Sequence, residues 1–198
     1  SGDWAAKVAA RMQPEKLAAM EAHFETTKGA SLVLLGIPDP DTGAVKYGIH
    51  IPKMLSFLAH GDFNASVTGL RDFPRADWPN VTICHIGFQI MVGCGMALIG
   101  VGALFFGYLA WKRKVPSERW ILAALAASSP LGFIALGAGW FVTEVGRQPW
   151  IVYHVMRTSE AVTPRTDVHL TLMLYVALYT LLTVGLLVLL RGLVGQGT

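Results

Sequence analysis

The chain has 198 residues, of which 53% are hydrophobic and only 15% are charged, and its net charge is +3. Soluble domains carry about a quarter charged residues, so this composition argues against a purely soluble protein. The net charge is small, and no cluster of Lys and Arg is interleaved with aromatic residues, so we predict no nucleic-acid partner.

The beginning of the chain differs from the rest. Residues 1–82 hold most of the acidic residues, several prolines and no apolar run long enough to cross a membrane, so we predict an extramembrane segment. Within it, the sequence MQPEKLAAMEAHFETTKG (12–29) predicts one helix. Pro14 suits a first helical position, apolar residues recur at helical spacing, and Gly29 suits a helix end.

Two charged residues lie on this predicted helix. Lys16 and Glu21 are five residues apart, about 140° around the helix axis. Exposed charges are the default, so the residues alone indicate an ordinary solvated face.

The next stretch, GIPDPDTGAVKYGIHIPKML, predicts a turn between two short extended segments. Asp39 and Asp41 faintly resemble the start of a calcium loop. The twelfth position of such a loop would be His50 instead of Glu, so no calcium site is predicted.

Three long runs without Asp, Glu, Lys or Arg follow, at residues 83–111, 120–143 and 170–190. Each reaches the roughly 20 residues that cross a hydrocarbon core about 30 Å thick. We therefore predict an all-α integral membrane protein in which three transmembrane helices follow the extramembrane segment. The predicted division of the chain is 1–82 extramembrane, 83–111 helix, 112–119 loop, 120–145 helix, 146–168 loop, 169–191 helix and 192–198 tail.

The short loop 112–119, KRKVPSER with its flanking residues, fixes the expected orientation. It gathers four basic residues, and the positive-inside rule places such a loop in the cytoplasm. Residues 1–82 and 146–168 then lie outside, and the tail 192–198 lies inside. Because the chain starts without Met or an apolar signal region, we expect it to be the C-terminal part of a longer polytopic protein, or half of a split or cleaved one.

Ionisable residues at membrane depth are functional candidates by default. Glu144 closes the second predicted span, with Trp140 one turn before it and Arg147 just after it. Two interpretations remain open from the residues alone. The group is an interfacial anchor with an aromatic belt residue, or Glu144 is a carboxylate that ligates a metal or carries protons.

The first span contains HIGFQIMVGCG. Met91 fits ordinary packing, but a thioether is also an axial haem ligand, and the glycines around it would let a flat macrocycle or another helix approach. We expect His85, and likewise His154 and His169, to be hydrogen-bonded interfacial residues. Two cysteines, Cys84 and Cys94, are ten residues apart on one helix, about 15 Å, which is too far for a disulfide.

No phosphate-binding glycine loop, HExxH, CxxC or nucleophile elbow is present. Composition and spacing thus indicate a three-span membrane fragment with a redox or proton site. Three stretches go further: GWFVTEVGRQPW (139–150), FQIMVGCG (88–95) and QPEKLAAMEAHFETTKGA with LLGIPD (13–39). In order and spacing they resemble the second half of subunit I of the bacterial cytochrome bd quinol oxidases, over essentially the whole chain. The connecting loop is short, as in the short-loop members of that family.

The resemblance implies a role for six residues. Lys16 and Glu21 match the quinol-loop pair, which binds quinol and helps to take its protons. Met91 matches the axial ligand of the low-spin haem b, whose His partner lies on an upstream helix outside this chain. The others are Glu144, which matches the carboxylate at the high-spin haems, and Trp140 and Arg147, which match residues that line that site.

One residue departs from the family pattern. Gln89 stands two positions before Met91, where some members carry Arg, so a contact with a haem propionate would be weaker or made differently.

The implied function is a terminal oxidase of the bacterial inner membrane that oxidises quinol, reduces oxygen to water and contributes to the proton motive force. Its cofactors would be a low-spin haem b, a high-spin haem b and haem d. Its partners would be the remaining N-terminal half of subunit I, subunit II, small accessory subunits and membrane lipid. Two alternatives stay open: a haem-bearing, quinone-linked electron-transfer subunit that does not reduce oxygen, and a structural or transporter bundle without haem.

Overall fold

The structure is a computed structural model that describes residues 2–162 and 167–195. Two compact units follow one another along the chain, Ser1–Ala161 and Val162–Thr198, and each is described by itself. The second unit contains the single long helix α7 (Val168–Gly195). All the side chains discussed below as a site belong to the first unit.

The first unit consists of helices joined by short strands and turns. Its helices are α1 (Gly2–Met12), α2 (Pro14–Met20), α3 (Met54–His60), α4 (Val81–Lys112), α5 (Arg119–Ser128) and α6 (Leu131–Val145), with short 3-10 turns at Leu70–Asp72, Arg75–Asp77 and Thr158–Ala161. Its strands are β1 (Thr27–Lys28), β2 (Leu32–Leu34), β3 (Ile37–Asp39), β4 (Ala44–Lys46), β5 (Ile49–Ile51), β6 (Ser66–Val67), β7 (Trp150–Val152) and β8 (Met156–Arg157). The strands form four antiparallel pairs, β1–β6, β2–β5, β3–β4 and β7–β8.

The prediction of three membrane-spanning helices is confirmed for the described part of the chain. Three stretches are long and apolar enough to cross a membrane: Val81–Lys112, Arg119–Val145 and Val168–Gly192. Their mean hydropathies are 2.1, 1.9 and 2.3, and few of the residues in their most apolar stretches are fully buried within the chain itself: none in the first and third, and 11% in the second. Apolar helices with this much free surface require lipid or further protein around them.

The second span is not one continuous helix, as the range 120–145 predicted, but two. Helix α5 ends at Ser128, and α6 begins after Pro130. Proline has no N–H to donate within a helix, and its ring clashes with the preceding turn. The hydroxyl of Ser128 donates to the carbonyl of Leu125 at 2.8 Å, which replaces part of the lost bonding.

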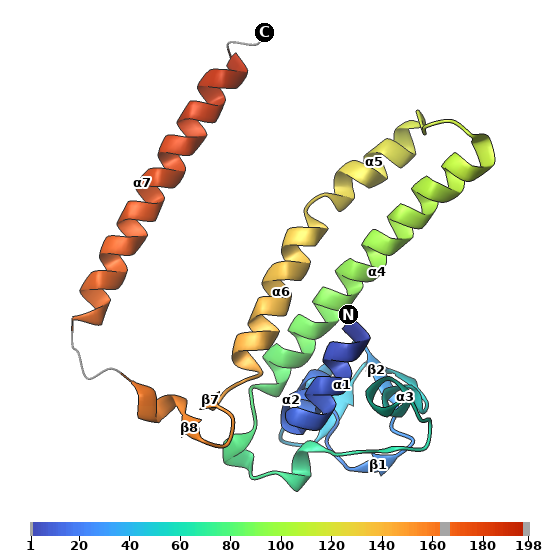
Figure 1. Cartoon of the computed structure of the whole chain (residues 1–198), viewed down its shortest axis with the longest axis vertical. Coiled ribbons are helices and arrows are strands. Elements are labelled where there is room, and N and C mark those ends of the chain that lie inside the picture. Colours follow the sequence, from blue (N-terminus) through green and yellow to red (C-terminus); the bar gives the residue numbers. More distant parts are fainter. Residues whose placement is uncertain (1, 163–166, 196–198) are drawn as a thin grey trace. The chain divides into compact units, whose positions relative to one another are not determined.

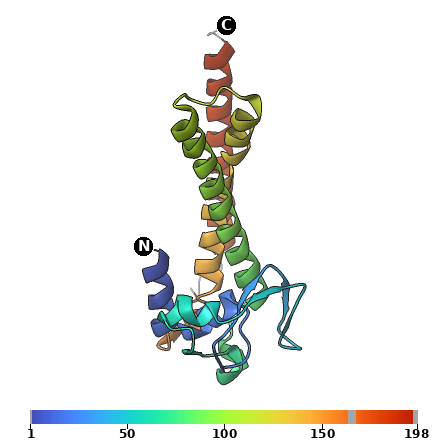
Figure 2. The ribbon, with the colours of Figure 1, turned by 90° about the vertical axis from the view of Figure 1, so that its right-hand side faces the viewer.

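Helices α4 and α6 run side by side in opposite directions, as Figures 1 and 2 show. Glycines allow the close approach. A Cβ built at Gly87 would lie 3.0 Å from Cγ2 of Val142, and one at Gly139 would lie 3.0 Å from the sulfur of Met91. Small residues at such contacts let two membrane helices pack backbone against side chain. The extramembrane elements gather at the end of this pair where α4 begins (Figure 1).

The predicted single helix over residues 12–29 is wrong, because α2 ends at Met20. Ala22 adopts a left-handed conformation with φ of 50°. Its N–H donates to the carbonyl of Ala19, and the N–H of His23 donates to that of Ala18 at 2.8 Å. This pair of bonds is the Schellman arrangement that closes a helix, here with Ala in the position that usually holds Gly.

Beyond that stop, the chain turns into the extramembrane core. Phe24 is buried and lies 6.3 Å from the ring of Trp78, centroid to centroid. The predicted turn between two extended segments is confirmed as the β3–β4 hairpin. The Asp39 carboxylate accepts backbone N–H bonds from Asp41 and Thr42 and pairs with Lys46 at 3.3 Å, so it shapes the turn.

Candidate functional site

The ionisable pair at the end of α6 is an ion pair. The guanidinium of Arg147 lies 2.5 Å from a carboxylate oxygen of Glu144, three residues earlier. Both side chains are about half exposed, at 43% and 45%. The pair sits where the apolar helix ends, so one face of each group remains free to meet a ligand.

The helix α2 brings a third charge to this pair. A Cβ on Gly146 would lie 3.2 Å from Cε and 3.3 Å from Cγ of Lys16, so the lysine stem runs across this glycine. Burial is the main cause that lowers the pKa of Lys16, and the nearby charges of Arg147 and Glu144 act on it in opposite directions. The structure therefore joins three predicted site residues, which come from two regions more than 120 residues apart.

Glu21 lies just beyond the other end of α2. Its side chain is only 5% exposed, and among the described residues one of its carboxylate oxygens has no hydrogen-bond partner. Burial raises the pKa of Glu21 to about 8. The interpretation of Lys16 and Glu21 as a solvated face is therefore wrong for Glu21, which is a buried acid outside the membrane spans.

A histidine of α4 holds the end of α2. His85 is fully buried, and its Nδ1 donates a hydrogen bond to the carbonyl oxygen of Met20 at 2.8 Å. This confirms that His85 is a hydrogen-bonded residue at the edge of the span. The bond fixes Met20, so it also positions the next residue, Glu21.

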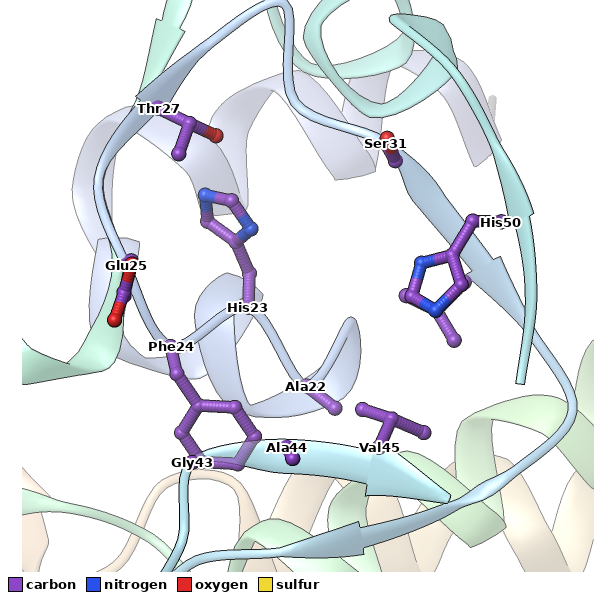
Figure 3. A pocket seen from close by; sticks show the side chains of 11 residues that line it. Ala22, His23, Phe24, Glu25, Thr27, Ser31, Gly43, Ala44, Val45 and His50 are labelled. Carbon is purple, nitrogen blue, oxygen red and sulfur yellow. The ribbon is translucent and has the colours of Figure 1, made fainter. Parts of the chain in front are cut away.

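An open pocket lies beside the turn that follows Glu21 (Figure 3). Its volume is about 420 Å³, and it is lined by residues 22–25, 27, 31, 33, 43–45 and 50. Figure 3 shows the imidazoles of His23 and His50 on opposite sides of it. A volume of this size suits a small ring molecule, and two imidazoles could bond to polar groups at its opposite ends. The sequence does not indicate these two histidines as a pair, because they are 27 residues apart and only the fold, including the pairing of His50 with Val33, puts them around one pocket.

Met91 and Trp140 lie away from the charged cluster. Met91 is half-buried on α4, and its sulfur rests against Gly139 of α6. Trp140 is 67% exposed and contacts Phe141 with ring centroids 6.4 Å apart. Among the described residues, Trp140 forms no hydrogen bond with Glu144 or Arg147, although it precedes Glu144 by one turn on the same helix.

Gln89, the departure from the family pattern, has a clear role here. Its amide nitrogen donates to the carbonyl of Val33 at 2.8 Å, and its amide oxygen accepts from the N–H of Leu35 at 3.3 Å. One side chain thereby ties two backbone groups at the β2–β3 corner to α4. No local pattern could have indicated this, since the partners are more than 50 residues apart.

The cysteines are free, Cys84 fully buried and Cys94 half-buried, so the expectation that they do not form a disulfide is confirmed. His169 lies on α7 in the second unit. His154, expected as a simple interfacial residue, has its Nε2 3.3 Å from a carboxylate oxygen of the buried Glu15.

The donor groups fit haem. Met91, half-buried, offers a thioether, and Glu144, about half exposed, offers a carboxylate, and both are groups that can bind iron. On α4, Cβ atoms built at Gly93 and at Gly95 would meet nothing within 4 Å, so there is free space beside the helix at each of these two glycines. A flat macrocycle could lie in such a space.

The comparisons with known proteins agree on one family. The family model for the cytochrome bd terminal oxidase subunit I matches residues 1–198. The putative cytochrome bd menaquinol oxidase subunit I of Bacillus subtilis is 36% identical over 185 residues, which cover 92% of this chain and 41% of that protein. The bd oxidase from Geobacillus thermodenitrificans is a similar structure, with a TM-score of 0.79 and 41% identity, covering 93% of this chain and 42% of that one.

The cytochrome bd-II ubiquinol oxidase subunit 1 of Escherichia coli is more distant, at 27% identity over 252 aligned positions. That alignment is longer than this chain, so the relative carries inserted residues, as expected if this chain has the short loop. The chain spans between 37% and 49% of the length of the curated relatives that it matches. Over its whole length, however, this chain belongs to the cytochrome bd terminal oxidase subunit I family.

Proposed function

We propose that the chain is the C-terminal part of subunit I of a quinol oxidase of the cytochrome bd type, which oxidises membrane quinol and reduces oxygen to water. Membership of the family supports this. The main structural support is that Lys16, from the extramembrane segment, packs against Gly146, between Glu144 and Arg147 in the chain, at the end of a membrane span. A quinol-binding segment and an iron-binding carboxylate would then share one side of the membrane.

Quinol binds to the extramembrane segment in this proposal. Lys16 hydrogen-bonds to the quinol head group, and Glu21 takes a proton from it. Two features support these roles: burial lowers the pKa of Lys16, and burial raises the pKa of Glu21 to about 8. A carboxyl group that titrates near neutral pH is suited to accept and release protons. The pocket between His23 and His50 opens at residues 22–25, directly after Glu21 in the chain, but neither Lys16 nor Glu21 lines it, so the quinol head group is proposed to bind at Lys16 and not in that pocket.

Met91 would hold the low-spin haem b, and Glu144 would hold a high-spin haem, either the second haem b or haem d. Trp140 and Arg147 would line the high-spin site, where Arg147 keeps Glu144 oriented through their ion pair. When bound, the haems supply the one-electron redox chemistry and the oxygen chemistry. This chain supplies a ligand from each of α4 and α6, while the remaining ligands would come from the N-terminal half of subunit I.

The proposed location is the bacterial inner membrane. Residues 1–82 and 146–168 would face the periplasm, and residues 112–119 and 192–198 the cytoplasm. Subunit II, small accessory subunits and lipid would cover the apolar surfaces of the three spans, which are almost entirely free in the described residues.

A visible spectrum of the purified complex tests the proposal. We expect bands of low-spin haem b and of haem d. Low-spin bands without a haem d band would favour a quinone-linked electron-transfer subunit, and the absence of haem bands would favour a bundle without haem.

A variant tests the ligand of the low-spin haem. In Met91→Leu the low-spin haem b signal should be lost, because leucine offers no iron ligand. The matched control is Met96→Leu, since Met96 lies on the same helix with 63% of its surface exposed. An unchanged spectrum in Met91→Leu would show that Met91 does not bind the haem iron.

The quinol site is tested by kinetics. Lys16→Ala should raise the quinol KM, because it removes a proposed hydrogen bond to the head group. Lys46→Ala is the control: the Lys46 side chain is 65% exposed and pairs with Asp39 in the hairpin turn, so this change should leave the KM near the wild-type value. Equal KM values in both variants would contradict the role of Lys16.

A further inference from the structure

The proposed function leaves one buried carboxylate unused. Glu15 precedes Lys16 on α2, and its side chain is only 3% exposed. Among the described residues, neither of its carboxylate oxygens has a hydrogen-bond partner. Buried carboxylates without hydrogen bonds are costly, so a fold that keeps one needs a reason.

An enclosed cavity adjoins this carboxylate. The space inside it for the centre of a water molecule is about 10 Å³, which is about the least that one bound water needs. It is lined by Gln13, Glu15, Lys16, Asp77, Pro79, Gly146, Arg147, Gln148, Trp150 and Tyr153. The indole N–H of Trp150 is likewise buried and lacks a partner among the described residues. A water in this cavity would therefore find both donors and acceptors in its wall.

One titratable group connects Glu15 with solvent. The Nε2 of His154 lies 3.3 Å from Oε1 of Glu15, while the His154 side chain is 55% exposed. Its ring is held between Trp150 and Tyr153, with centroid distances of 5.1 and 4.2 Å. Histidine is the side chain that exchanges protons most readily near neutral pH. The contact is at ion-pair distance but is not aligned as a hydrogen bond, so a small rotation of the imidazole would be needed to join Glu15 to the surface.

The cavity is also lined by three other charged residues, Lys16, Arg147 and Asp77. Lys16 and Arg147 bring two positive charges, which offset the negative charge of Glu15 before it accepts a proton. Asp77 forms an ion pair with Arg157, whose guanidinium also lies 4.7 Å from the centre of the Trp150 ring. Asp77 therefore already has a cationic partner, and Glu15 is the carboxylate at this cavity that remains available.

We propose that Glu15 and His154 form the exit through which protons released from quinol reach the outer side. This rests on the proposed function, since the cavity is lined by Lys16, a proposed quinol ligand. A quinol hydroxyl gives its proton through the cavity water to the Glu15 carboxylate. Glu15 passes it to Nε2 of His154, the imidazolium releases the proton on Nδ1 to solvent, and rotation of the ring restores the first state. The electrons leave separately, to haem iron.

The test uses the complete oxidase complex and two variants, Glu15→Gln and His154→Ala. We expect quinol turnover to fall by at least about a hundredfold in each at neutral pH, which is the low end for the loss of a proton-transfer group. The quinol KM and the haem spectrum should stay close to wild type, because neither residue binds quinol or haem in this proposal. Added imidazole should restore turnover in His154→Ala but not in Glu15→Gln, where the inner group is missing.

Two control variants change the same residue types elsewhere in the extramembrane segment. Asp62→Asn removes an exposed carboxylate, and His60→Ala removes an exposed imidazole at the end of α3. Both should turn over as wild type, with or without imidazole.

Wild-type turnover in both Glu15→Gln and His154→Ala would overturn the proposal, as would a His154→Ala variant that is slow but insensitive to imidazole. If Glu15→Gln loses its haem spectrum, and so its fold, the imidazole response of His154→Ala decides alone. Failure of the proposed function looks different, since the wild-type complex itself would then not oxidise quinol.

Discussion

Glu21 is an acid that folding removes from water, and its burial makes the stability of the protein depend on pH. Burial raises the pKa of Glu21 to about 8 from its ordinary 4.5. Between these two values the unfolded chain has lost the proton while the native chain keeps it. The native state then binds more protons, so the free energy of unfolding falls as pH rises, by up to about 1.4 kcal/mol per pH unit.

Glu21→Gln should remove this dependence, since the amide does not ionise. We expect the midpoint temperature of unfolding of the variant complex to change less between pH 5 and 8 than that of wild type, with the largest gain over wild type near pH 8. Thermal unfolding monitored by tryptophan fluorescence at several pH values measures this. Other groups titrate in both proteins, so only the difference between the two curves reports on Glu21, and parallel curves would contradict its burial as an acid.

The sequence predicts contacts between neighbouring residues better than it predicts which polar side chains are buried. The ion pair of Glu144 and Arg147 could be expected because Arg147 follows Glu144 by three residues at the end of α6, a spacing at which side chains in helical conformation can meet. Glu15 could not be distinguished from a surface acid, because its burial depends on the distant residues 146–154 that pack over it. Nothing in a helical pattern indicates which polar side chain another segment will cover.

The turn after α6 depends on a glycine. A Cβ on Gly146 would lie 2.4 Å from the carbonyl oxygen of Val142 and within 3.3 Å of two carbons of Lys16. Because the first of these contacts is with backbone, Gly146→Ala must shift the turn. We expect a destabilisation of about 1–3 kcal/mol and a raised quinol KM, since Lys16 is displaced as well.

Gly132→Ala on the same helix is the matched control, because its Cβ would meet nothing within 4 Å among the described residues. Alanine favours the helix over glycine, so this change should be neutral or stabilising by up to about 1 kcal/mol. Unfolding of the two variant complexes by heat, together with their quinol KM values, makes the comparison. Equal behaviour of both variants would show that the Gly146 contact is not tight.

Gln89 joins the β2–β3 corner to α4 through two hydrogen bonds to backbone groups. Gln89→Leu removes both and should loosen the corner, at a cost of about 1 kcal/mol for each bond. Faster hydrogen exchange at the amide of Leu35 would report the loss directly. Gln89→Glu keeps an acceptor for Leu35 but removes the donor to Val33, so its Leu35 amide should stay protected. Unchanged exchange in the leucine variant would mean that the corner is held by other contacts.

At the level of elements, the spans were the easiest part to predict and the helix ends the hardest. Long apolar runs reflect the thickness of the bilayer, which acts on every residue of α4 and α7 alike. The stop of α2 depends instead on one alanine, Ala22, in a left-handed conformation, and alanine normally favours continuing a helix. The bonds from Ala22 and His23 to earlier carbonyls, and that from His85 to Met20, outweigh this preference.

For the molecule as a whole, the fold class followed from composition, while the assembly of the site did not. The site requires that the extramembrane segment fold back on the end of α6, so that Lys16 reaches Gly146. This return is specified by packing among residues such as Leu70, Ala19 and Cys84, which are fully buried in one cluster that joins the extramembrane segment to the start of α4. Such contacts lie far apart in sequence and leave no periodic pattern.

The orientation of the chain gives a prediction for the whole molecule. Helix α4 has 32 residues. At about 1.5 Å per residue this is longer than the hydrocarbon core of about 30 Å, so its two ends should lie on opposite sides of the membrane. Thr42, in the exposed hairpin turn before α4, should face outward, and Ser117, in the exposed loop after it, should face the cytoplasm.

Thr42→Cys and Ser117→Cys test this with a thiol reagent that does not cross membranes. In spheroplasts, Thr42→Cys should react with the reagent and Ser117→Cys should not. In inside-out membrane vesicles, Ser117→Cys should react and Thr42→Cys should not. The natural cysteines contribute little background, because Cys84 is buried and Cys94 lies half-buried within the span. If both variants react from the same side of the membrane, α4 does not cross it. The extramembrane segment before α4 and Glu144, which follows α5 and α6, would then lie on opposite sides, and this would contradict the proposed site.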